Sequence, residues 1–174
     1  DALFAREKLG STGLGQGIKD YDHVASEVRK VPGVTGATPF TYNQAMISAG
    51  GGVIGAVIRG LDVKSASEVT VLPSKVKDGT LDGLEVPVEA SGKKAGIVIG
   101  RELARNIGAQ VGDDVNVISP MGTMTPAGPV PRIATFMVTG IFEVGMYEYD
   151  SSLAFISLEN SQKFFRLGDV ATGV

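Results

Sequence analysis

The side chains that most often carry out catalysis or bind metal ions are scarce in this sequence. It contains one histidine, His23, and no cysteine, which excludes thiolate zinc sites and cysteine nucleophiles. A serine hydrolase would need His23 as its base, yet no serine lies in a Gly-x-Ser-x-Gly elbow. Asp113 and Asp114 are adjacent, so their carboxylates would point to opposite faces of a strand, and a turn explains them better. We therefore expect no catalytic residue, no metal site and no enzyme activity.

A glycine-rich segment at residues 10–17 suggests phosphate binding, because the backbone amides of such loops can surround an anion. The segment lacks the Gly-Lys-Ser/Thr ending of a phosphate loop, and no clear helix follows it directly. We interpret it as a surface loop and expect the chain itself to bind no nucleotide and no other cofactor.

The bulk composition indicates a folded domain that does not bind nucleic acid. Of the 174 residues, 43% are hydrophobic, which is enough for a core. The formal net charge is −3, whereas nucleic-acid phosphates require a basic surface. No apolar run approaches the roughly 20 residues that span a bilayer. The first ten residues lack the apolar core of a signal peptide, which suggests a domain taken from a longer protein.

The segment from Ser119 to Arg132 has the composition of a protein-binding arm. It reads Ser-Pro-Met-Gly-Thr-Met-Thr-Pro-Ala-Gly-Pro-Val-Pro-Arg, with four of the eight prolines and no charge before Arg132. Two to five residues suffice to join two strands, so the extra length requires another explanation. Prolines lower the entropic cost of ordering on binding, and Met121 and Met124 offer adaptable apolar contacts. We predict a projecting β-hairpin arm, and the alternative is a loop folded back over the core of its own domain.

Periodicity and turn residues predict a mixed α and β domain with mostly antiparallel strands. The clearest elements are a buried strand at residues 97–99 and a helix at 101–107, which Gly108 ends with a positive φ. The other predicted elements are a strand at 3–9, a helix from about 21 to 31, a hairpin of 34–49 and 53–59 across a triple glycine, turns with short strands or one short helix at 62–91, strands at 114–119 and 133–142, a strand at 153–156, and a helix from Ser157 to Leu167 that Gly168 ends.

The segment Gly145–Asp150 combines aromatic and acidic residues before the last strand. Its tyrosines either bind a partner or pack as amphipathic rings at the end of a strand. We favour packing.

Several groups of residues resemble a known family. The run Gly-Ile-Val-Ile-Gly-Arg-Glu-Leu-Ala at 96–104, with Ile107-Gly108 and Val111-Gly-Asp113, resembles the extracytoplasmic domain of MacB-like ABC transporters. The continuation is similar to the lipoprotein-releasing permeases of the LolC/LolE family, through Ser119-Pro120, Thr125-Pro126, Pro131-Arg132, and the segments 138–142, 145–150 and 169–173. The segments 31–34, 38–40 and 59–62 also fit that family, whereas residues 1–17 and 62–91 match it loosely.

This resemblance implies an α+β fold of the MacB-like periplasmic core type, with Porter and Sabre subdomains. It implies one ectodomain over residues 1–174, in which residues of about 1–48 and 95–174 form the Porter-like part and a Sabre-like insertion lies between them. The domain would lie on the periplasmic face of an inner-membrane permease that pairs with a homologous subunit or a second copy of itself. A separate cytoplasmic ATPase, LolD, would use the ATP, and the complex would pass lipoproteins to the periplasmic carrier LolA.

In this family a β-hairpin called the Hook binds LolA beside a surface called the Pad, and LolE-like members lack the Hook. The resemblance therefore implies a Hook-bearing, LolC-like subunit. The residues that match the Hook are Pro120, Met121, Met124, Thr125, Pro126, Pro129 and Pro131, with Met124, Thr125 and Pro126 at its tip. Arg132 and Asn116 fall near the Pad, where Asn116 replaces a basic residue.

Two alternative functions stand beside this one. The first is the ectodomain of another MacB-like exporter, which would contact a different periplasmic partner. The second is a secreted hydrolase or ligand-binding module, which should show a deep pocket with converging titratable groups. Binding of LolA by the purified domain would distinguish a lipoprotein-releasing permease from both alternatives.

Overall fold

The computed structural model describes residues 17–50, 52–87, 94–125 and 128–174, and it confirms a mixed α and β fold. Its helices are α1 (Tyr21–Arg29), α2 (Val63–Val69), α3 (Leu72–Lys75), α4 (Arg101–Ile107), α5 (Tyr147–Ser152) and α6 (Leu158–Phe165), with a 3-10 helix η1 (Asp82–Glu85). Its strands are β1 (Phe40–Ala49), β2 (Gly52–Leu61), β3 (Val76–Gly79), β4 (Gly96–Gly100), β5 (Asp114–Thr125), β6 (Gly128–Phe142) and β7 (Leu153–Ser157).

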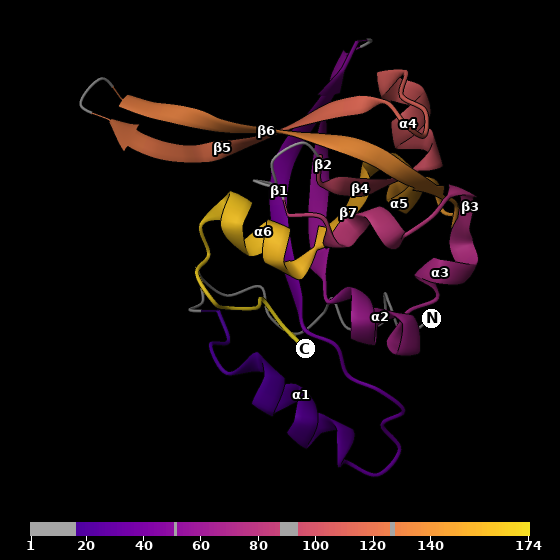
Figure 1. Cartoon of the computed structure of the whole chain (residues 1–174), viewed down its shortest axis with the longest axis vertical. Helices are drawn as coiled ribbons and strands as arrows, with labels where there is room; N and C mark the ends of the chain where they lie inside the picture. Colours follow the sequence, from indigo (N-terminus) through magenta and orange to yellow (C-terminus); the bar gives the residue numbers. More distant parts are fainter. Residues whose placement is uncertain (1–16, 51, 88–93, 126–127) are drawn as a thin grey trace.

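The strands form a ring that β6 closes (Figure 1). The order β6-β4-β7-β2-β1-β5 returns to β6, because β6 pairs with β5 along its first part and with β4 along its end. The short strand β3 pairs with the last residues of β6. Most pairs are antiparallel, as predicted, but β2 with β7 and β4 with β6 run parallel.

Strands β4 and β7 are buried on both faces, which explains the unbroken apolar run at Ile97–Ile99. Ile97 and Ile99 belong to a core cluster that also contains residues of α4 and α6. Val98, on the other face, belongs to a second cluster, with residues of α2, α3 and η1. In that second cluster the rings of Phe142 and Phe155 pack edge to face, with their centroids 5.3 Å apart.

Helix α4 matches its predicted bounds, and Gly108 ends it in the left-handed region with a φ of 71°. The N–H of Gly108 donates to the carbonyl of Arg105 at 3.2 Å, and that of Ala109 donates to the carbonyl of Ala104 at 2.9 Å. These bonds satisfy carbonyl groups of the last turn, and glycine adopts this conformation without a steric penalty.

We expect Gly108→Val to lower the free energy of unfolding by about 1 to 2 kcal/mol, because a side chain disfavours the left-handed conformation. A Cβ at this position would meet no atom within 4 Å, so backbone strain alone is tested. Gly55→Val is the matched control, since Gly55 lies in β2 with equally open space and without a positive φ. Thermal melting measures both variants, and an unchanged melting temperature of Gly108→Val would contradict the assigned helix end.

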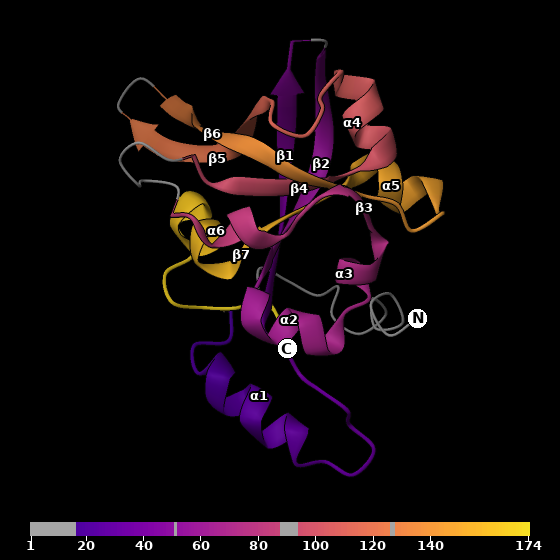
Figure 2. The same cartoon turned by 45° about the vertical axis from the view of Figure 1, so that its right-hand side comes forward.

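The hairpin of β1 and β2 confirms the predicted reversal at the triple glycine, with a regular register from Phe40 opposite Leu61 to Ala49 opposite Gly52. Strand β1 begins at Phe40, later than predicted. Helix α1 stands away from the strands at one end of the molecule (Figure 2). At the same end the chain near Ile18 forms an antiparallel bridge with Ala171. In the described part of the chain, no helix has the length and apolar character needed to cross a membrane.

Three sequence predictions differ from the structure. Helix α6 begins at the predicted cap, where the Ser157 hydroxyl accepts from the N–H of Asn160 at 3.2 Å. It ends at Phe165 and not at Leu167, because Arg166 already takes the left-handed conformation, two residues before Gly168, which was predicted to end the helix. Residues 62–91 contain more helix than predicted, since Asp62 caps α2 and Pro73 lies in the first turn of α3. The segment 145–150 also contains the start of a helix, α5.

Other predictions are not tested. The strand predicted at residues 3–9 lies outside the described residues, as does the surface loop predicted at residues 10–17, apart from Gly17. The subdomain boundaries stay a prediction, although β2, within the predicted insertion, pairs with β1 on one side and β7 on the other.

Candidate partner-binding site

The ribbon of β5 and β6 extends beyond the ring and projects from the molecule (Figures 1 and 2). Its ladder places Ser119 opposite Arg132 and Thr125 opposite Gly128, with a register shift on β5 between Ser119 and Thr123. We call the part from Ser119 to Arg132 the arm. The strands therefore continue through the segment predicted as their connection, and the prediction of a projecting hairpin is confirmed.

The structure describes the predicted Hook residues to different degrees. Pro120 and Pro131 are exposed near the root of the arm. The backbones of Met121, Met124, Thr125 and Pro129 lie in the two strands, where the structure does not describe their side chains, and Pro126 lies outside the described residues. The structure thus describes the course of the arm and leaves the contacts of its tip as predictions.

Arg132 and Asn116, predicted for the Pad, lie on opposite faces of the β5–β6 ribbon. Arg132 is on the face of the buried residues, where its Nη1 donates to the carbonyl of Phe164 in α6 at 3.4 Å. Asn116 is on the outer face, and its Oδ1 accepts from the Thr135 hydroxyl at 2.8 Å. The two side chains are therefore not brought together, and Arg132 partly attaches the root of the arm to α6.

An exposed apolar row crosses the sheet beside the arm. Met46 of β1 lies opposite Ile118 of β5, which lies opposite Ile133 of β6, so the three side chains share one face. Met46 is 38% exposed and Ile133 62% exposed. The sequence analysis missed this row because its residues come from three strands. Alternation of buried and exposed positions in each strand was the signal that could have suggested it.

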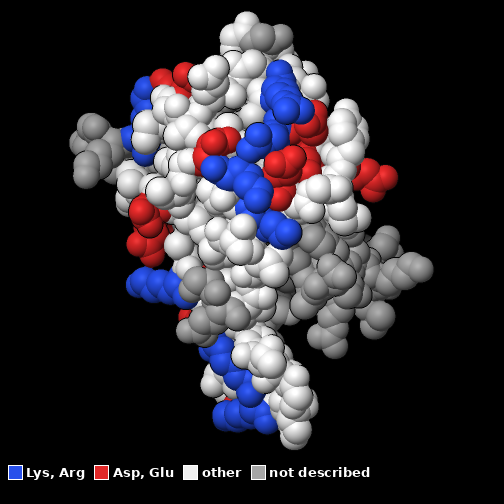
Figure 3. Space-filling view, turned by 90° about the vertical axis from the view of Figure 1, so that its right-hand side faces the viewer, with Lys and Arg blue, Asp and Glu red and all other residues white. Residues whose placement is uncertain are grey.

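The arm and the opposite side of the domain differ in charge. Between Asp114 and Arg132 the chain has no charged residue, and Asp114 forms an ion pair with Lys94 at the start of β5. On the face that carries α4 and β3, basic and acidic side chains alternate (Figure 3). Because charged residues are depleted at the centres of protein interfaces, the arm is the better candidate for an apolar contact.

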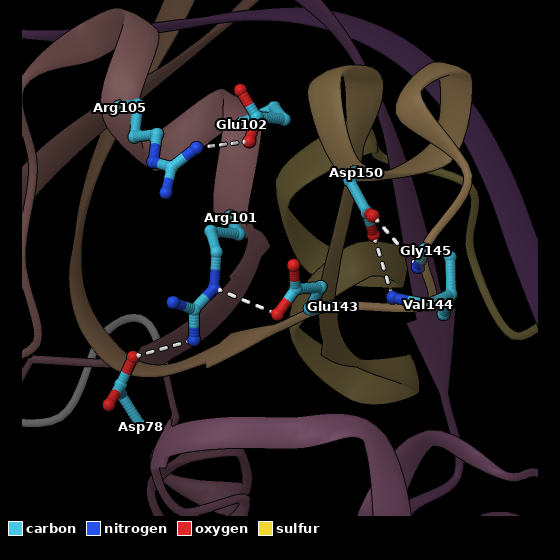
Figure 4. Close-up of polar contacts among 8 residues, drawn as sticks. All are labelled: Asp78, Arg101, Glu102, Arg105, Glu143, Val144, Gly145 and Asp150. Carbon is cyan, nitrogen blue, oxygen red and sulfur yellow. Dashed lines mark hydrogen bonds and ion pairs between the residues drawn. The ribbon is translucent and has the colours of Figure 1, made fainter.

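The charged face contains an ion-pair network at the N-terminus of α4 (Figure 4). Arg101 donates from Nη2 to Asp78 of β3 at 3.2 Å, and its Nε lies 3.3 Å from the carboxylate of Glu143. Arg105 donates to Glu102 within the same helix at 2.6 Å. Each pair has one exposed partner, although Arg101 and Glu102 are half-buried, so the pairs join neighbouring elements but contribute little stability each.

Asp150 is a buried carboxylate that the sequence analysis did not single out. It is 4% exposed, and it accepts from the N–H groups of Val144 at 2.8 Å and Gly145 at 3.0 Å (Figure 4). The side chain therefore closes the turn between β6 and α5. Its carboxylate stabilises the fold, because it accepts hydrogen bonds from the backbone of its own turn.

A depression of about 290 Å³ lies between α4 and the end of β6. Its lining combines the side chains of Asp78, Arg101 and Arg105 with the apolar Ala104 and Ile141. It is open, and its charged groups belong to the ion pairs above. Within the described residues, no three histidine, aspartate or glutamate side chains gather in a way that could hold a metal ion.

Comparison with curated proteins shows relatives over most of the chain. LolC of Xylella fastidiosa, a lipoprotein-releasing system transmembrane protein, is 36% identical over 160 residues, which are 92% of this chain and 37% of that protein. LolC of Neisseria meningitidis serogroup B is 34% identical over 142 residues, which are 82% of this chain and 33% of that protein. The chain thus spans about a third of the length of these relatives.

Two solved structures share the fold. The extracellular domain of YknZ, a noncanonic ABC-type transporter from Gram-positive bacteria, superimposes with a TM-score of 0.59 at 13% identity and covers 90% of this chain and 71% of that chain. The periplasmic region of MacB from Actinobacillus actinomycetemcomitans superimposes with a TM-score of 0.57 at 17% identity and covers 92% of this chain and 64% of that chain.

The family model named MacB-like periplasmic core domain matches residues 6–173, almost the whole chain. This match agrees with the shared fold and with the sequence similarity to two LolC proteins. The family describes a periplasmic part of transporters and not an enzyme. This chain therefore belongs to the MacB-like periplasmic core domain family, as a LolC-like member.

Proposed function

We propose that this chain is the part of a lipoprotein-releasing ABC permease that binds the periplasmic carrier LolA, and that the arm is the main contact. In this proposal the full-length protein pairs with a homologous permease subunit or a second copy of itself in the inner membrane. The cytoplasmic ATPase LolD supplies the energy, and lipoproteins leave the membrane for the carrier.

The observation that carries the proposal is the arm itself. It projects from the ring as a two-stranded ribbon, and no charge interrupts it between Asp114 and Arg132. A loop folded over its own core, the alternative considered for this segment, does not fit a ladder that continues to Thr125 opposite Gly128. The similarity to LolC proteins, named for lipoprotein release, supports the choice of lipoproteins as the substrate.

The root of the arm suggests how a carrier would lie against the domain. The apolar row of Met46, Ile118 and Ile133 continues from the outer face of the arm and offers uncharged surface beside it. Asn116 lies on that same face, whereas Arg132 faces α6. A carrier seated on the outer face would meet Asn116, and it would reach Arg132 only by extending around the edge of the ribbon.

We expect Met124→Ala and Pro126→Gly to weaken binding of the carrier with little effect on folding. Truncation of a central interface residue commonly costs about 2 kcal/mol, which is roughly a thirtyfold loss of affinity. Surface changes away from the core alter stability by about 0.5 kcal/mol or less. Calorimetric titration with LolA and thermal melting measure the two effects. Val31→Ala is the control, because Val31 is 53% exposed and follows α1, the helix that stands away from the strands in Figure 1.

The two measurements together decide between the interpretations. Lower melting temperatures with intact carrier binding would show that the arm stabilises its own domain and does not bind the carrier. A wild-type domain that ignores LolA would favour the ectodomain of another exporter, for which the shared fold of MacB and YknZ is the supporting observation.

A further inference from the structure

The direction of each backbone N–H along β6 follows from two hydrogen bonds. The N–H of Val138 donates to the carbonyl of Asp113 at 2.8 Å, toward β5, and the N–H of Met137 donates to the carbonyl of Ala95 at 2.9 Å, toward β4. Successive residues of a strand alternate in this direction. Because the register shift lies on β5, even-numbered residues of β6 face β5 and odd-numbered residues face away from it.

The side of β6 away from β5 is a free edge along the arm. Strand β4 pairs with β6 only from Met137 onward, and no described strand pairs with residues 128–136 on that side. The backbone positions that face this edge are 129, 131, 133 and 135. Proline occupies 129 and 131, the two that lie in the arm, and proline has no N–H to donate.

A third proline, Pro120 of β5, removes a backbone donor on the other side of the arm. Strand β1 pairs with β5 at Asn116, Val117 and Ile118, and the pairing ends there although β1 continues back to Phe40. Residues 116, 118 and 120 face the same way by alternation. Pro120, two residues beyond Ile118 and at the register shift of β5, has no N–H with which the pairing to β1 could continue.

We infer that these prolines keep the arm a free two-stranded ribbon and close its β6 edge to strand addition. An unpaired edge with its donors intact is a template for another strand, either of a partner or of a second copy of this chain. Within the arm, the β6 edge then offers acceptors only, and the next donors on this side are the N–H groups of Ile133 and Thr135 at the root. A partner on this side then contacts the arm through its side-chain faces, which fits an uncharged, apolar surface and not an exposed strand.

The inference concerns the chain alone, so it is tested without any carrier and does not depend on the proposed function. Pro129→Thr with Pro131→Thr restores two edge donors with a residue that favours strands. We expect the self-association constant, measured by sedimentation velocity over a concentration series, to rise about tenfold or more, because two backbone hydrogen bonds can then form across the contact.

Val130→Thr is the matched control, because it introduces the same side chain at a residue whose N–H faces β5. It should associate no more than wild type. A double variant that sediments like wild type, or a control that associates as strongly as the double variant, would overturn the inference. If circular dichroism shows that the double variant is unfolded, Pro131→Thr alone decides: a rise in association supports the inference and no rise overturns it.

Discussion

Asp150→Ala is expected to lower the free energy of unfolding by about 2 to 3 kcal/mol, which corresponds to roughly 5 to 10 °C in melting temperature. The carboxylate is buried and accepts two backbone hydrogen bonds, from Val144 and Gly145. Hydrogen bonds to charged groups are the stronger ones, and the truncated side chain would leave two donors without a partner. The turn that joins β6 to α5 would loosen, and α5 packs beside α4 and β4.

Two further variants show whether the hydrogen bonds cause this loss. Asp150→Asn keeps one acceptor oxygen and should lose less stability than Asp150→Ala. Glu148→Ala removes an exposed acid from the same helix, so it should change the melting temperature little. Equal effects of Asp150→Ala and Glu148→Ala would contradict the assigned role. The experiment is a thermal or denaturant melt of the purified chain.

Deletion of residues 122–129 is expected to abolish transfer of lipoproteins to LolA by the full-length permease. The deletion removes the outer part of the arm and leaves the ring, whose strands pair independently of it. Loss of several interface residues together exceeds the roughly thirtyfold effect of one, so we expect binding below detection. Release of a labelled lipoprotein from reconstituted vesicles into the soluble carrier fraction measures the transfer.

The ATPase activity of the same reconstituted complex separates this effect from misfolding. ATP hydrolysis that persists while transfer is lost would show an assembled complex that has lost only its contact with the carrier. Wild-type levels of transfer by the shortened permease would exclude the arm as the main contact.

The elements predicted best from sequence are those that depend on neighbouring residues. Helix α4 and its end at Gly108 were predicted because a buried face, a left-handed glycine and a following turn are all local. Helix α5 was not predicted from the sequence. Its buried residue, Asp150, accepts hydrogen bonds from Val144 and Gly145, which precede the helix, and such contacts leave no periodic pattern in the sequence. The parallel pairing of β2 with β7 and of β4 with β6 was not predicted, because pairing between distant strands leaves no trace in either strand alone.

The same distinction between local and long-range features applies to the candidate site. Proline, methionine and the lack of charge between residues 119 and 132 indicated an arm, and the structure contains one. The opposite facing of Asn116 and Arg132 depends on alternation in two strands and on the contact of Arg132 with α6. The apolar row of Met46, Ile118 and Ile133 depends on strand order. Such features need the register, which composition does not supply.

Site-specific photo-crosslinking tests the central claim most directly, because it reports which surface touches the carrier. A photoreactive residue at position 130, where Val130 is 52% exposed on the arm, should form a covalent adduct with LolA on illumination. The same residue at position 147, where Tyr147 is 67% exposed on α5 away from the arm, should form none. An adduct from position 147 and none from position 130 would contradict the assignment of the arm as the carrier-binding site.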